Sequence, residues 1–163
     1  MVISLISIFF ACVIGLVLGI LISEKMGAAK PTLSVVNFLY TIPSLALLGL
    51  LIPFTGAGQT TAIIALTAYG LLPIVKNTHT GICNINPAII EAARGMGSTR
   101  WQMLFKIKLP LAFPVIMSGF RNMVTMTISL TSIAAYIGAG GLGTAIFRGI
   151  STNNMAMVLV GSI

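Results

Sequence analysis

The chain has 163 residues, of which 57% are hydrophobic and only 7% are charged, and its formal net charge is +7. An ordinary soluble domain carries about 25% charged residues, so this composition excludes that class and indicates a protein embedded in a lipid bilayer. The nine basic residues lie between apolar runs rather than in one stripe, which argues against nucleic-acid binding and is typical of membrane loops.

Apolar runs predict four membrane-spanning helices and the start of a fifth. They cover residues about 2–23, 33–52, 60–78 and 111–136, then a glycine-rich re-entrant or surface segment at 138–153 and a final run from about 154. The final run is too short to cross a bilayer, which takes about 20 apolar residues. We therefore expect one membrane domain over residues 1–163, all-α with about five transmembrane helices, whose ends have been removed.

Two of the predicted spans contain an internal proline with polar side chains nearby. Pro43 cannot donate to the carbonyl of Leu39, and Pro73 cannot donate to that of Tyr69, so both carbonyls are expected to be free within the bilayer. Such carbonyls must face protein or a watery path. The residues expected to line a translocation path here are Tyr40, Thr41, Pro43, Ser44 and Tyr69. A packing kink that neighbouring helices satisfy is an equal alternative at each position.

Arg121 is a further candidate for this path. It lies about 11 residues into the span that follows Pro110, roughly 16 Å along a helix. An arginine at that depth is costly in lipid, so it is expected to face the helix bundle or a cavity. The alternative is a shallower arginine whose long side chain reaches the inner surface.

Between the third and fourth predicted spans, at about residues 86–109, apolar and charged residues mix at close spacing. Asn86 is suited to cap a helix that has Pro87 in its first turn, and the glycines that follow are expected to end it. Ser98 is expected to cap a second helix. The stretch predicts two helices joined by a turn at the membrane surface, which we call the elbow. In its simplest interpretation, its basic residues meet lipid head groups.

The elbow also carries a pattern at fixed spacing. The residues of this pattern are Glu91, Ala92, Ala93, then after three residues Gly97, and after nine more Ile107, Leu109 and Pro110. The pattern resembles the EAA loop of the permease subunits of bacterial ABC importers. The flanking text TIPSLALLGLLIP, YGLLPIVKNTHTGI and AAYIGAGGLGTAIFRGI is similar to the branch that carries osmoprotectants such as glycine betaine, carnitine and choline.

The resemblance implies the methionine-importer-like core of a type I ABC importer, with a coupling helix that docks a cytoplasmic ATP-binding subunit through Glu91, Ala92, Ala93 and Gly97. It also implies a second permease subunit, identical or not, and an extracytoplasmic solute-binding protein or fused domain. ATP hydrolysis would belong to the ATP-binding subunit. We expect no catalytic residue, cofactor or metal ion in this chain, which has two acidic residues and one histidine.

Charge predicts the orientation in a bacterial inner membrane. Arg148 falls on one side, and seven basic residues fall on the side of the first loop and the elbow: Lys25, Lys30, Lys76, Arg94, Arg100, Lys106 and Lys108. The positive-inside rule then makes the elbow cytoplasmic and the N-terminus external. Two alternatives are a related importer for another small solute, such as an amino acid, ergothioneine or a bile-acid-like molecule, and an ATPase-independent channel or scaffold.

Overall fold

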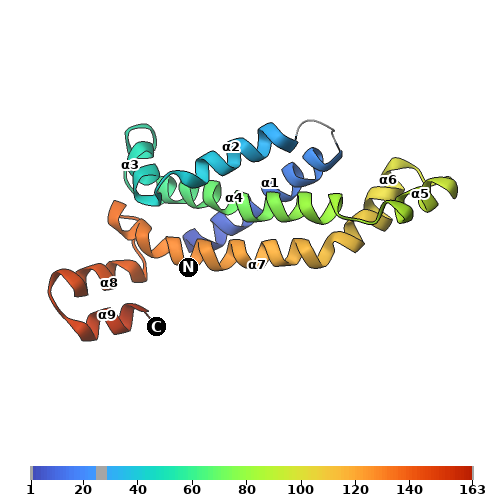
Figure 1. The fold of residues 1–163 in the computed structure, drawn as a ribbon. Coiled ribbons are helices and arrows are strands. Elements are labelled where there is room, and N and C mark those ends of the chain that lie inside the picture. Colours follow the sequence, from blue (N-terminus) through green and yellow to red (C-terminus); the bar gives the residue numbers. More distant parts are fainter. Residues whose placement is uncertain (1, 25–28, 163) are drawn as a thin grey trace.

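The computed structural model describes residues 2–24 and 29–162, and every regular element in these ranges is helical. The elements are α1 (Val2–Glu24), α2 (Ala29–Thr41), α3 (Ser44–Thr55), α4 (Gln59–Cys83), α5 (Pro87–Gly95), α6 (Arg100–Gln102), a π-helical segment (Met103–Lys108), α7 (Leu109–Ile133), a 3-10 turn (Ala134–Ile137), α8 (Leu142–Ser151) and α9 (Met155–Ser162). The expected all-α class is confirmed (Figure 1).

Three helical stretches are long and apolar enough to cross a membrane: Val2–Glu24, Gln59–Cys83 and Arg100–Ile137. α2 and α3 pass the same test together, but they meet at an angle of 97°. The described residues therefore supply three spanning stretches, or the four expected complete spans if the bent pair is one span. α9, at the position of the expected fifth span, is eight residues long.

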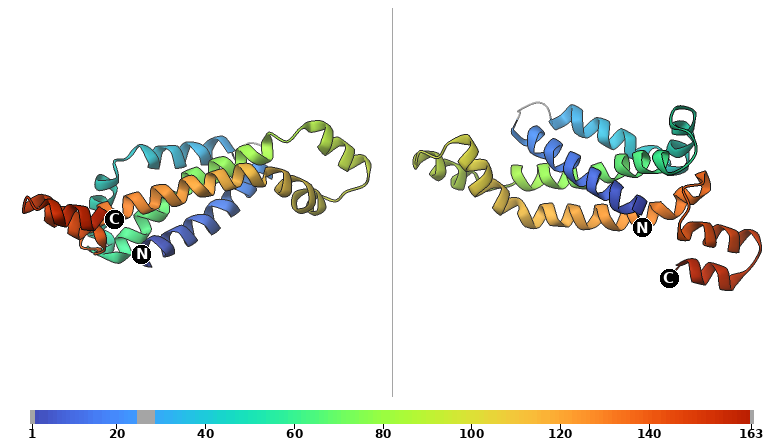
Figure 2. Two further views of the ribbon diagram at one scale, coloured as in Figure 1. Left: turned by 90° about the horizontal axis from the view of Figure 1, so that it is seen from below. Right: turned by 180° about the vertical axis from the view of Figure 1, so that it is seen from behind.

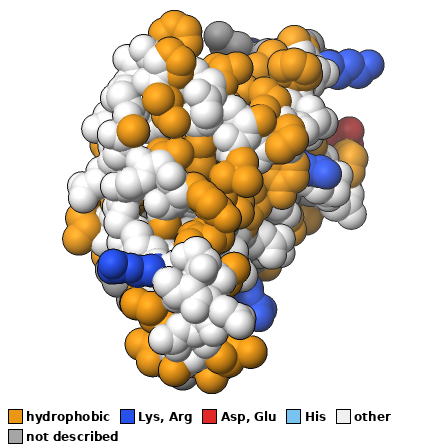
Figure 3. Space-filling view, turned by 90° about the vertical axis from the view of Figure 1, so that its left-hand side faces the viewer, with side chains coloured by type: hydrophobic (Ala, Val, Ile, Leu, Met, Phe, Trp, Pro, Cys, Tyr) orange, Lys and Arg blue, Asp and Glu red, His pale blue; other side chains and the backbone are white. Residues whose placement is uncertain are grey.

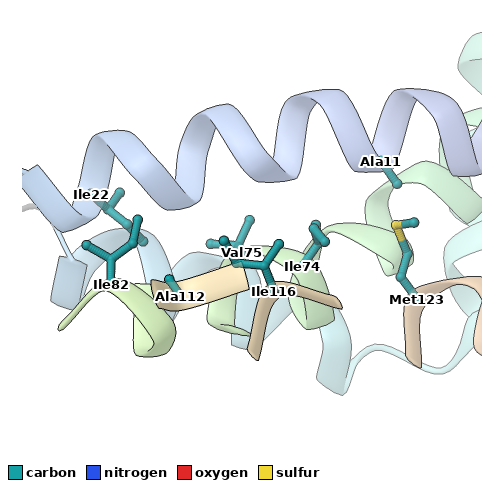
Figure 4. Close-up of a cluster of buried hydrophobic side chains, with 8 residues drawn as sticks. All are labelled: Ala11, Ile22, Ile74, Val75, Ile82, Ala112, Ile116 and Met123. Atoms are coloured by element: carbon teal, nitrogen blue, oxygen red, sulfur yellow. The ribbon is translucent and has the colours of Figure 1, made fainter. Parts of the chain in front are cut away.

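α4 is the central helix, because it contacts α1, α2, α3 and α7. Buried apolar side chains from α1, α4 and α7 meet in one cluster along its length (Figure 4). A Cβ atom placed on Gly15 of α1 would lie 1.9 Å from Cγ2 of Ile74, and one on Gly19 would lie 2.6 Å from Cβ of Thr78. Small residues therefore let the backbones of α1 and α4 approach closely, which is how helices associate in lipid.

The molecule is elongated along α4 and α7, and its two ends differ (Figures 1 and 2). The elbow, with α5 and α6, projects beyond the long helices at one end, whereas α3, α8 and α9 lie at the other. Seen from the latter end, apolar and uncharged side chains make up nearly all of the surface, and basic side chains are isolated (Figure 3). The scarcity of charge on this end agrees with the chain's 7% of charged residues.

The prediction that the second span is one kinked helix is wrong, because the chain forms two helices, α2 and α3, in this region. The Leu39 carbonyl, expected to be free, accepts from the backbone N–H of Ile42 at 3.4 Å. The carbonyl that receives a side-chain donor is that of Ile42, which accepts from the Tyr69 hydroxyl of α4. The chain therefore turns sharply at Pro43, because α4 supplies the partner that a broken helix needs. Pro73, by contrast, is accommodated within α4, which continues on both sides of it.

One other predicted boundary is corrected. The span expected from about residue 111 belongs to a helical run that begins at Arg100, because α6, the π-helical segment and α7 follow one another without a break. The segment at 138–153 contains α8, and its re-entrant or surface position stays a prediction. A turn with positive φ at Gly138, Gly140 and Gly141 precedes this helix, a conformation that glycine adopts at little cost.

Candidate functional site

The first helix of the elbow begins as its sequence predicts. The Asn86 side chain accepts a hydrogen bond from the Ala88 N–H at 3.0 Å, and Pro87 occupies the first turn. The first N–H groups of a helix have no partner within it. The Asn86 oxygen satisfies one of these groups, and Pro87 has no N–H to satisfy. These local signals fix the start of α5 without help from the rest of the chain.

The end of α5 is a Schellman motif with Gly97 at its centre. The Ser98 N–H donates to the Ala93 carbonyl at 3.1 Å, and the Gly97 N–H donates to the Arg94 carbonyl at 2.9 Å. Gly97 has φ of +79°, the left-handed conformation that this motif requires. A Cβ atom there would meet nothing within 4 Å, so the glycine is required for its backbone and not for space.

The second helix of the elbow is capped by Thr99, which corrects the expected cap at Ser98. The Gln102 N–H donates to Oγ1 of Thr99 at 3.3 Å, and the Thr99 N–H donates to Oε1 of Gln102 at 2.9 Å. This reciprocal pair is a capping box, which needs a Gln or Glu three residues after the cap. Gln102 stands at that distance from Thr99 and not from Ser98, so it selects the later residue.

The elbow leaves large apolar side chains uncovered. Met96 is 80% exposed and Trp101 is 71% exposed, and the Trp101 ring stacks on that of Phe105 at a centroid distance of 5.8 Å. A rimmed apolar patch of this kind marks a surface for interaction with another molecule. Of the residues expected to dock an ATPase, Glu91, Ala92 and Gly97 are exposed, whereas Ala93 is buried. Their docking role stays a prediction.

An ion pair joins the elbow to the first helix. The Lys108 ammonium, at the end of the π-helical segment, contacts the carboxylate of Glu24, the last residue of α1. The two residues are 84 positions apart in the chain, so this contact fixes the end of α1 beside the start of α7. Lys25, counted above with the basic residues of this side, lies outside the described residues.

A polar groove of about 970 Å³ lies between α4 and α7, with one residue from α2. Its lining residues are Tyr40, Leu72, Pro73, Lys76, Asn77, Thr80, Ser118, Arg121, Asn122, Thr125 and Met126. Two of the residues expected to line a path, Tyr40 and Arg121, are therefore brought together. A surface with this many polar groups on membrane-spanning helices must face water or protein rather than lipid.

The other expected path residues lie elsewhere. Ser44 and Tyr69 border a small, separate pocket, and the Thr41 hydroxyl donates to its own helix at the Phe38 carbonyl. Tyr40 connects the two regions, because its ring lies edge-on to that of Tyr69 with centroids 5.9 Å apart. Pro43 marks the break before α3. The role of these residues in a path stays a prediction.

Most residues of the groove are not among those expected to line a path, although the sequence carries a signal for them. Polar residues recur on one face of α7 at Ser118, Arg121, Asn122 and Thr125, a spacing of three and four residues. α4 has the matching set of Lys76, Asn77 and Thr80. Because residues three and four apart share a helix face, this periodicity predicts a polar stripe on each of the two spans.

The chain is similar to known membrane transport proteins. The family model for the inner membrane component of binding-protein-dependent transport systems matches residues 11–163. The chain is 42% identical over 161 residues to the glycine betaine/carnitine/choline transport system permease protein OpuCD of Bacillus subtilis (strain 168), covering 98% of this chain and 70% of that protein. It is 43% identical over 155 residues to the ergothioneine transport permease/ergothioneine binding protein EgtU of Helicobacter pylori (strain G27), covering 95% and 28%.

Among solved structures, one of the MetNI methionine ABC transporter in an inward-facing conformation matches with a TM-score of 0.86 and 27% sequence identity. The match covers 98% of this chain and 81% of that one. The arrangement of helices described above is therefore shared along nearly the whole chain.

Proposed function

The chain belongs to the family of binding-protein-dependent transport system inner membrane components, and on that premise we propose that it is the permease subunit of an ATP-driven importer of osmoprotectants. The proposed solutes are quaternary ammonium compounds such as glycine betaine, carnitine and choline, as in the name of the relative OpuCD. The chain supplies the membrane path, and a separate cytoplasmic ATP-binding subunit hydrolyses ATP.

The observation that carries this proposal is the construction of the elbow. Two capped helices and a glycine turn hold a largely exposed surface beyond the end of α4 and α7 (Figure 1). Met96 and Trp101 give this surface apolar anchors, and Glu91 gives it a carboxylate. Such a surface suits docking of a soluble subunit, whereas a channel without an ATPase has no use for it.

A second permease subunit, identical or not, completes the path in this proposal. The polar groove is open in the single chain and needs water or protein beside it in the bilayer. Pairing of two permeases across their grooves encloses a watery passage between them. An extracytoplasmic solute-binding protein or fused domain delivers the solute to the end of the molecule opposite the elbow.

The elbow lies in the cytoplasm in this proposal. Basic residues support this side, because Lys30, Arg94 and Lys108 lie at the elbow end and Arg148 lies on α8 at the opposite end (Figure 1). Native Cys83, which is exposed just before the elbow, is a reporter of topology. In a Cys12→Ser background, a membrane-impermeant maleimide should label Cys83 in inside-out vesicles only. Labelling in right-side-out vesicles would reverse the orientation.

Docking is tested with a matched pair of methionines. Met96 of the elbow is 80% exposed and Met155 of α9 is 72% exposed, so Met96→Ala and Met155→Ala remove similar apolar surface at opposite ends of the molecule. Met96→Ala and Glu91→Ala should reduce co-purification of the ATP-binding subunit, and Met155→Ala should not. Equal retention of that subunit by all three variants would contradict docking at the elbow.

Transport is tested by reconstituting the permease, its ATP-binding subunit and its binding protein in liposomes. ATP-dependent accumulation of radiolabelled glycine betaine is the expected result, and solute entry without ATP would favour a channel. The relationship with EgtU makes ergothioneine a second candidate solute. Titrating the binding protein or domain with each of the two solutes separates these candidates, because the tighter ligand identifies the solute.

A further inference from the structure

Two positively charged side chains face the polar groove at the level where α4 and α7 touch. Lys76 comes from α4 and Arg121 from α7, and both are exposed to the groove. α4 and α7 are in contact next to both cations. A Cβ atom on Gly119, two residues before Arg121, would lie 2.6 Å from Cβ of Asn77, the residue after Lys76. The two cations therefore lie on opposite walls of the same section of the groove.

This section lies within the membrane-spanning part of the helices. Twelve residues of α7 precede Arg121 and twelve follow it, so the backbone of Arg121 lies at the middle of α7. Lys76 lies seven residues before the end of α4, which is roughly 10 Å along a helix. A cation at such a depth is costly unless water or a counter-charge accompanies it.

The chain itself holds no counter-charge for this pair. It has two acidic residues in all. Glu24 pairs with Lys108, and Glu91 lies on α5 of the elbow. Within the part of the chain that the structure describes, neither the Lys76 ammonium nor the Arg121 guanidinium has a hydrogen-bond or ion-pair partner. A second identical chain across the groove would add two more cations, and its groove lining, like this one, has no acidic residue.

The neutral polar groups beside the pair are partly committed to their own helices. The Asn77 side-chain N–H donates to the Pro73 carbonyl at 2.8 Å, and the Thr125 hydroxyl donates to the Arg121 carbonyl at 3.0 Å. The charged donors that face the groove are those of Lys76 and Arg121. Arginine presents a planar fork that matches a carboxylate, and lysine adds a second charged donor.

We propose that Lys76 and Arg121 form a binding site for the carboxylate of a zwitterionic solute during its passage through the groove. This inference rests on the proposed function, and it narrows the solute class from quaternary ammonium compounds in general to those that carry a carboxylate, such as glycine betaine. Choline is a net cation with a hydroxyl group and no carboxylate, so the pair repels it.

Equilibrium dialysis of the purified permease–ATPase complex in nanodiscs, without binding protein, tests the site directly. Wild type should bind radiolabelled glycine betaine, and Arg121→Gln and Lys76→Gln should each weaken binding by about tenfold, as expected for the loss of one charge-assisted hydrogen bond. Arg148→Gln, on α8 away from the groove, is the matched control and should bind as wild type does. Radiolabelled choline binding should not weaken in either groove variant, because each substitution removes a charge that repels this cation.

Several results would overturn the site. They are no glycine betaine binding to wild type, equal loss for glycine betaine and choline, or unchanged binding in both groove variants. An anionic lipid phosphate is the other source of a counter-charge. Nanodiscs of pure phosphatidylcholine remove that source, so an effect of Arg121→Gln that appears only with added phosphatidylglycerol would assign the pair to lipid. Retained elution with the ATPase shows that each variant is folded.

Failure of the proposed function is a separate result. In that case the complex would not accumulate solute in the presence of ATP, whatever glycine betaine binds in the dialysis experiment.

Discussion

Replacing Gly97 by alanine should weaken docking of the ATP-binding subunit through the backbone alone. Gly97 has φ of +79°, and a Cβ atom there meets nothing within 4 Å, so the substitution adds strain and no clash. The left-handed conformation costs an L-residue about 1–2 kcal/mol. α5 has nine residues, too few for a stable isolated helix, so this strain should shift the elbow away from its folded form. If docking needs the folded elbow, the apparent affinity falls with the folded fraction, by at most about 5- to 30-fold.

Gly95→Ala is the control, because it changes the same residue type two positions earlier. Gly95 is the last residue of α5, its φ is not positive, and a Cβ atom there also meets nothing within 4 Å. Alanine is the better helix former by about 1 kcal/mol, so this variant should bind as tightly as wild type or more tightly. The measurement is the dissociation constant of the ATP-binding subunit for detergent-solubilised permease. Equal constants for the two variants would refute a role for the Gly97 turn.

Three further substitutions test the packing of the helices. Gly15→Ala places a Cβ atom 1.9 Å from the fully buried Ile74 and should cost about 1–3 kcal/mol, lowering the thermal unfolding midpoint in detergent, whereas Gly49→Ala, which meets nothing, should not. Tyr69→Phe removes the hydroxyl that donates to the Ile42 carbonyl at the α2–α3 break and should cost about 1–3 kcal/mol of stability. It should speed amide hydrogen exchange at the break more than in α7. Glu24→Gln breaks a part-exposed ion pair worth less than about 1 kcal/mol, so a large drop in the midpoint would contradict that estimate.

The elbow could be predicted from sequence almost completely because its signals are local. The cap at Asn86, the proline after it and the turn at Gly97 each act within five residues of their partners. The error in its second cap, Ser98 instead of Thr99, arose because both residues are good caps and only the position of Gln102 distinguishes them.

The break between α2 and α3 could not be predicted in the same way. Pro43 indicates a disturbance, but whether the helix kinks or turns by 97° depends on a donor from another helix. That donor is the Tyr69 hydroxyl, 27 residues further along the chain. The polar groove could be predicted in part. The polar stripe on each helix is visible in the sequence, whereas the pairing of α4 with α7 is a tertiary contact.

The helical run Arg100–Ile137, which joins the elbow to α7, stays continuous across Pro110. Pro110 cannot donate to the carbonyl four residues before it, and its ring crowds that carbonyl. The π-helical segment Met103–Lys108 widens the helix just before this point, with the Leu109 N–H donating to the Leu104 carbonyl five residues back. The helix therefore passes the proline without a break, so the second helix of the elbow, from Arg100, continues directly into α7. Since Lys108 also binds the end of α1, we expect a displacement of the elbow to move α7 and α1 together.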